Sequence, residues 1–213
     1  DGMSLPSGAE IAAALRGLAA ALRGDPAAPS WYDLSVDGFW RSFWPPLIAA
    51  AAYFAILQPG VIEGAIEGAI EGVIEGAVDS ADGLAGMEAS RLGFSLVQAV
   101  LFLASWLIYL AAMVVLCRAF RLTDRFAVFV TLYNWAQGIV SMISVPVLAA
   151  TQWGLLPAGA MAGWNFVLLF VWLYVVAQIA RVNFGATPIL AMGIAALDLG
   201  IALLLHGLAG SLL

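Results

Sequence analysis

The sequence predicts an all-α membrane protein, a polytopic bundle of about five transmembrane helices with an N-terminal amphipathic interfacial helix. Hydrophobic residues make up 63% of the 213 residues and charged residues only 10%, and the mean hydropathy is +0.99. Soluble domains carry about a quarter charged residues. A span needs about 20 apolar residues, so this length holds about five. We divide the chain into a cytoplasmic or interfacial N-terminal segment, 1–44, and a single transmembrane bundle, 45–213.

The first expected element is a short amphipathic helix that begins after Ser7. Glu10 follows Ser7 by three residues, which is the capping-box pattern, and apolar residues then recur at helical spacing until Gly24. Arg16 and Arg23 flank the apolar stripe, as in helices that lie on an anionic membrane surface. Two placements stay open for this helix: docking at the membrane interface, or packing of its stripe against the bundle itself.

An aromatic segment connects this helix to the first span. Its rings are interspersed with charged residues and belong to Trp31, Tyr32, Phe39, Trp40, Phe43 and Trp44. Such rings settle at the level of the lipid headgroups. Five apolar stretches follow, at 46–57, 94–117, 126–150, 158–180 and 188–212. The first is the shortest and needs the aromatic turn before it to reach one interface.

The arginines predict the orientation of the spans. Three precede the first span, three lie between the second and third, and one follows the fourth, whereas Arg91 alone falls on the other side. Because basic residues gather on the cytoplasmic side, we expect a cytoplasmic N-terminus and an external C-terminus. All eight cationic residues are arginine, which together with the alanine content is typical of a GC-rich bacterial genome, so we expect a bacterial inner-membrane protein. The net charge of −6 comes mainly from acidic residues between Glu63 and Glu88. Nucleic acid is therefore not an expected partner.

A four-residue repeat, 60–78, lies between the first two spans and is expected outside the membrane. It carries a glutamate ladder interleaved with glycines, which include Glu63, Gly64, Glu67, Gly68, Glu71, Gly72 and Glu75. Helix is favoured over loop or strand, although each interior glycine costs about 0.8 to 1 kcal/mol. Small residues at this spacing let two helices approach closely. Three roles stay open: a helix on the membrane surface, a contact in a homo-oligomer or larger membrane complex, and a carboxylate ladder that collects cations.

Asp198 is the one carboxylate well inside an expected span, about ten residues or 15 Å into the fifth helix. Asn134 and Gln137 of the third span reach a similar depth, and His206 approaches the depth of Asn165 in the fourth. These groups either form an interhelical hydrogen-bond set around a neutral Asp198, or act as an ion or proton relay. For His206 the structural role is favoured.

The sequence offers little for catalysis. It has no lysine, one histidine and one cysteine, and it lacks a P-loop, an H-E-x-x-H pair and a G-x-S-x-G turn. An intramembrane aspartyl protease needs a second buried acid beside Asp198. The single Cys117 supplies neither an internal disulfide nor a metal cluster. We expect no enzymatic activity, no cofactor and no metal site.

Topology and one short step in the third span carry a family resemblance. The chain has five expected spans, a polar cytoplasmic N-terminus and an arginine cluster before the third span, and the step Tyr133, Asn134, Trp135 lies within that span. The likeness covers about 91–213. In these features the chain resembles the Yip-type family, the Ypt-interacting five-span membrane proteins and their bacterial relatives. From Asp33 the chain reads Asp-Leu-Ser where eukaryotic members carry Asp-Leu-Tyr-Gly. The resemblance implies a non-enzymatic membrane organiser or trafficking adaptor.

Two hypotheses about function follow. The first is an inner-membrane scaffold, assembly factor or trafficking-type adaptor that contacts the lipid bilayer and other proteins through its interfacial helix and its repeat. The second is a small oligomeric ion or proton channel or transporter that uses Asp198. A dry, well-packed interior favours the scaffold, and a polar, water-accessible path favours the channel.

Overall fold

The computed structural model describes residues 5–57, 100–157 and 159–212, and within them every regular element is a helix. The predicted all-α bundle is confirmed. The elements in order are α1 (Gly8–Leu22), η1 (Ala28–Trp31), α2 (Val36–Arg41), α3 (Trp44–Leu57), the Val100–Ala119 helix, η2 (Thr123–Arg125), α6 (Phe126–Gln152), α7 (Gly159–Phe184) and α8 (Pro188–Leu212).

Four helices of the described chain are long and apolar enough to cross a membrane: Val100–Ala119, Thr123–Thr151, Gly159–Phe184 and Pro188–Leu208. The predicted count of five spans is not exact. The first expected span corresponds to α3, which has 14 described residues, whereas a span needs about 20. The glycine and glutamate repeat lies outside the described residues, so its three roles remain predictions.

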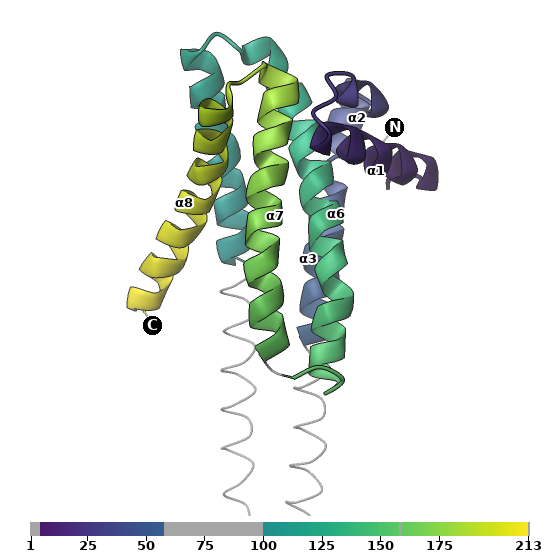
Figure 1. Cartoon of the computed structure of the whole chain (residues 1–213), viewed down its shortest axis with the longest axis vertical. Coiled ribbons are helices and arrows are strands. Elements are labelled where there is room, and N and C mark those ends of the chain that lie inside the picture. The colour runs from purple at the N-terminus through teal and green to yellow at the C-terminus, as the bar shows by residue number, and fades with distance from the viewer. Residues whose placement is uncertain (1–4, 58–99, 158, 213) are drawn as a thin grey trace, which may run out of the picture.

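The helices stand side by side, and the connection before α6 and the connection between α7 and α8 lie at one end (Figure 1). α6 packs against α3 and α7, and α8 packs against α7. α1 crosses the end of the bundle at which η2 and the last turn of α7 also lie, and α8 diverges from α7 toward its C-terminal end (Figure 1). The arginines that the sequence assigns to one side of a membrane are therefore at one end of the molecule.

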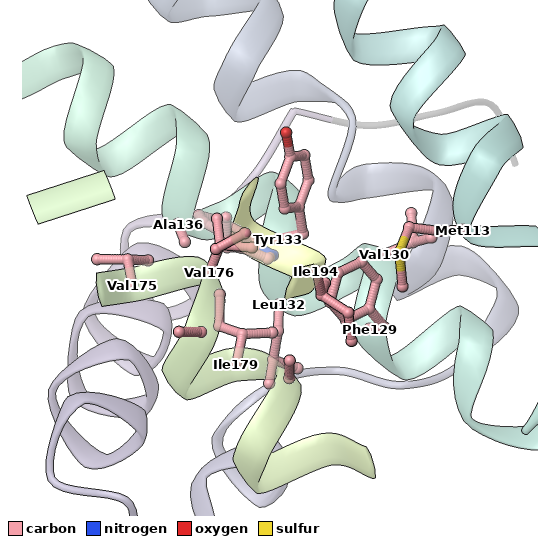
Figure 2. Packing of buried hydrophobic residues seen from close by; sticks show 14 of the residues in the cluster. Met113, Phe129, Val130, Leu132, Tyr133, Ala136, Val175, Val176, Ile179 and Ile194 are labelled. Atoms are coloured by element: carbon pink, nitrogen blue, oxygen red, sulfur yellow. The ribbon is translucent and has the colours of Figure 1, made fainter. Parts of the chain in front are cut away.

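The core forms where α6, α7, α8 and the Val100–Ala119 helix meet. Figure 2 shows Met113, Phe129, Tyr133, Val176 and Ile194 converging from these four helices. The ring of Phe129 stacks on those of Phe184 and Tyr133, with centroids 5.1 Å and 5.9 Å apart. α6 also contacts α1, α2 and α3, so it is the central helix of the bundle.

α1 begins with the predicted capping box. Ser7 Oγ accepts a hydrogen bond from the Glu10 N–H at 3.2 Å, and Glu10 Oε2 accepts one from the Ser7 N–H at 2.8 Å. Of the two expected placements of α1, packing against the bundle is observed for part of the helix, and docking at the membrane interface stays a prediction. Ala14 and other small residues are buried against the bundle, while Ile11 and Leu15 on the neighbouring flank are 45% and 49% exposed.

Candidate functional site

Asp198 lies where α6, α7 and α8 meet, with 9% of its surface exposed. The Tyr133 hydroxyl donates to Asp198 Oδ1 at 3.1 Å, and the Trp172 indole N–H donates to Oδ2 at 2.6 Å. The rings of Tyr133 and Trp172 meet edge to face, with centroids 5.3 Å apart. Each carboxylate oxygen thus has a donor from a different helix, and the three helices are tied together at this depth.

Tyr109 is a further buried tyrosine, and its ring packs on that of Tyr133 next to this hydrogen-bond set. Tyr109 is 0% exposed, and its ring centroid is 4.9 Å from that of Tyr133. Its Oη has no hydrogen-bond partner among the described residues. A buried hydroxyl without a partner costs about 1 to 3 kcal/mol, so this position favours an additional polar contact.

Asn134 belongs to a separate hydrogen-bond set, although it follows Tyr133 directly in the chain. The Trp106 indole N–H donates to Asn134 Oδ1 at 3.0 Å, and Asn134 Nδ2 donates to Ser42 Oγ at 3.1 Å. The Ser42 hydroxyl in turn donates to the Phe39 carbonyl at 2.7 Å. Consecutive helical residues point in different directions, so similar depth does not bring Asn134 to Asp198.

The other polar residues expected at similar depths do not join Asp198. His206 is exposed, and its Nδ1 lies 2.8 Å from the Ala202 carbonyl oxygen one turn earlier in the same helix. Asn165 is exposed on α7. Gln137 is half-buried, and its Oε1 has no partner within the described chain. The predicted grouping is therefore wrong for these residues, because sequence depth does not fix the face on which a side chain lies.

A cluster of charges, here called the N-terminal clasp, fixes the start of α1 to the segment before α3. Arg41 forms ion pairs with Glu10 Oε1 at 2.8 Å and with Asp33 Oδ2 at 2.6 Å. Partial burial raises the pKa of Glu10, but hydrogen bonds from Ser7 and the charge of Arg41 outweigh it and lower that pKa below its ordinary value. Hydrogen bonds from Ser35, aided by Arg41, lower the pKa of Asp33. Both carboxylates are therefore ionised partners of Arg41 at neutral pH.

The C-terminal end of α1 is hydrogen-bonded to α7. The Leu22 carbonyl accepts hydrogen bonds from the Tyr174 hydroxyl at 2.8 Å and from Gln178 Nε2 at 3.2 Å. Midway along α1, the Ala14 carbonyl accepts one from the Tyr32 hydroxyl at 3.2 Å, and a Cβ at Gly17 would overlap the Tyr32 ring. These contacts hold α1 along its length.

An apolar groove of about 520 Å³ lies between α1, α3 and α6. Residues along its walls are Ile11 and Leu15 of α1, Pro45 and Ile48 of α3, and Met142 and Ile143 of α6. Gly138 also lines the groove, and a Cβ there would overlap Pro45. α3 and α6 therefore approach closely at one end of the groove because residue 138 has no side chain.

Comparison with protein families, with curated proteins and with solved structures finds no match for this chain. Within the described ranges, no group of three or more His, Cys, Asp or Glu side chains is placed to hold a metal ion.

The sequence predicts buried polar roles for Asp198 and Asn134 but not their aromatic hydrogen-bond partners Tyr133, Trp172 and Trp106. The available signal was an indole N–H or a phenol at matching depth in a neighbouring span, since buried Trp and Tyr usually find a hydrogen-bond partner.

Proposed function

We propose that this protein is a non-enzymatic scaffold or assembly adaptor of a bacterial inner membrane, with a cytoplasmic N-terminus and an external C-terminus. The observation that carries the proposal is the fixed position of α1, which the clasp at Arg41 and the contacts at Leu22 hold across the end of the bundle. A helix held in this way presents a constant surface to partners, which reduces the ordering cost of binding.

The polar groups inside the bundle support the same proposal. Asp198 and Asn134 each accept from aromatic donors on other helices, and both sets join separate elements of the fold. The proposed kinship with the Yip-type family rests on the step Tyr133, Asn134, Trp135, and this step lies in α6 at the two hydrogen-bond sets. Tyr133 and Asn134 are central members of the two sets, and Trp135 lines the apolar groove.

A proton or ion channel or transporter is the second candidate, and the buried Tyr109 hydroxyl favours it, because the Tyr109 ring packs on that of Tyr133, which donates to Asp198. A relay needs a titratable group with polar neighbours that pass a proton on. Against a cation site, the Trp172 N–H points at Asp198 Oδ2, whereas a cation requires converging oxygen ligands. We therefore rank this function below the scaffold.

Site-specific photo-crosslinking in cells tests the scaffold proposal. A photoreactive amino acid is introduced at Val36 or at Trp40, which both lie in α2 and are 74% and 50% exposed. The expected result is a discrete adduct with a membrane protein or with a second copy of the chain. Phe166 of α7, 65% exposed, is the control and is expected to yield lipid adducts only. Absence of protein adducts at both N-terminal positions, or equal adducts at Phe166, contradicts the proposal.

A further inference from the structure

We propose that the groove between α1, α3 and α6 binds one acyl chain of an anionic phospholipid, whose headgroup is held by the arginines on the outer face of α1. The site goes beyond the scaffold role and does not depend on it.

The groove is shaped for a chain that runs along the membrane normal. α1 crosses the end of the bundle, and α3 and α6 run away from it (Figure 1). On α6 the groove extends from Trp135 to Ile143, eight residues or about 12 Å along the axis. Its volume of about 520 Å³ lies within the usual range for small-ligand sites, roughly 300 to 1,000 Å³.

The lining favours hydrocarbon over water. Apart from the Trp135 indole, the side chains along the groove carry no polar atom, and Ile11, Leu15 and Ile143 are about half exposed. Water in the groove finds almost no hydrogen-bond partner on such walls. An acyl chain already lies in hydrocarbon in the bilayer, so the groove gives it packing contacts and little additional hydrophobic gain. The groove therefore accepts an acyl chain but does not distinguish one lipid from another. The preference among lipids depends on the headgroup.

The charges on α1 select an anionic headgroup. Glu10 is paired with Arg41, so the remaining charges on α1 and its C-cap are Arg16 and Arg23, both exposed. Neither forms an ion pair within the part of the chain that the structure describes. At 100° per residue, Arg16 and Arg23 lie about 20° apart on the face of α1 that points away from the bundle, about 80° to 100° around the helix from Leu15 at the edge of the groove. The Arg16 guanidinium also lies over the Trp31 ring, 5.8 Å from the ring centroid. Each basic residue near an anionic surface favours binding by about fivefold.

Native mass spectrometry of the full chain, after exchange into defined lipids, tests the site. The probes are dioleoyl phosphatidylglycerol, dioleoyl phosphatidylcholine and oleate. Wild-type protein is expected to retain one phosphatidylglycerol in preference to the other two. Ile143→Trp fills the groove and is expected to lower that occupancy at least fivefold. Val167→Trp on α7 is the matched control, because Val167 and Ile143 are both 52% exposed, and it is expected to keep the lipid.

The headgroup is tested by Arg16→Gln combined with Arg23→Gln. The double variant is expected to lose the preference for phosphatidylglycerol by about 25-fold, from two arginines at fivefold each. Thermal melting identifies variants that remain folded. Unchanged lipid occupancy in Ile143→Trp, or equal retention of phosphatidylcholine or oleate by the wild type, overturns the proposal. A dimer mass that Ile143→Trp abolishes also overturns it, since a second copy then fills the groove.

Discussion

Replacing Asp198 with leucine is expected to lower the free energy of unfolding by about 2 to 4 kcal/mol. Leucine leaves the Tyr133 hydroxyl and the Trp172 N–H without their acceptor, and each buried donor without a partner costs about 1 to 3 kcal/mol. The loss is measured by reversible denaturation in detergent micelles. A leucine variant as stable as the wild type would show that these bonds do not hold α6, α7 and α8 together.

Asp198→Asn is the matched control for this prediction. The Trp172 indole can only donate, so the amide oxygen must face it, whereas the Tyr133 hydroxyl can turn and accept from the amide nitrogen. Both contacts are kept with an uncharged side chain. The asparagine variant is therefore expected to lie within about 1 kcal/mol of the wild type, which is the range of a single interhelical hydrogen bond in a membrane.

Gly138→Ala is expected to destabilise the protein by about 1 to 3 kcal/mol, the usual cost of overpacking a close contact. A Cβ at this position would lie against the backbone of Pro45, which cannot move aside as a flexible side chain can. α3 must then shift away from α6. The same denaturation assay measures the loss.

Gly193→Ala in α8 is the control, because a Cβ there has open space around it. Alanine is a better helix former than glycine by about 0.8 to 1 kcal/mol, so this variant is expected to be as stable as the wild type or more so. Equal effects of the two substitutions contradict the close contact between α3 and α6.

Local patterns in the sequence predicted the helices. The position of α1 on the bundle was not predicted, because it depends on contacts between residues far apart in the chain. The cap of α1 at Ser7 and Glu10 depends on residues three apart, and it forms as expected. The position of α1 on the bundle depends on the hydrogen bond between Leu22 and Tyr174, 152 residues apart. No local pattern contains that contact, so the two placements of α1 could not be separated.

The candidate site shows the same division. Asp198 stood out because a carboxylate is costly in an apolar span. Its partners did not stand out, because depth along a helix does not give the face, and Tyr133 rather than its neighbour Asn134 points at Asp198. The close contact at Gly138 was missed because a lone glycine in an apolar helix has no pattern around it, whereas the repeat at 60–78 drew attention through its regular spacing.

Proton flux through the reconstituted protein tests most directly whether Asp198 holds the helices together or carries protons. Liposomes with a pH-sensitive dye inside and an imposed potential report the flux of wild type and Asp198→Asn at matched protein content. The scaffold account predicts that neither exceeds protein-free liposomes. Flux in the wild type that is lost in Asp198→Asn, while the melting temperature is unchanged, would contradict that account and assign Asp198 to a proton relay.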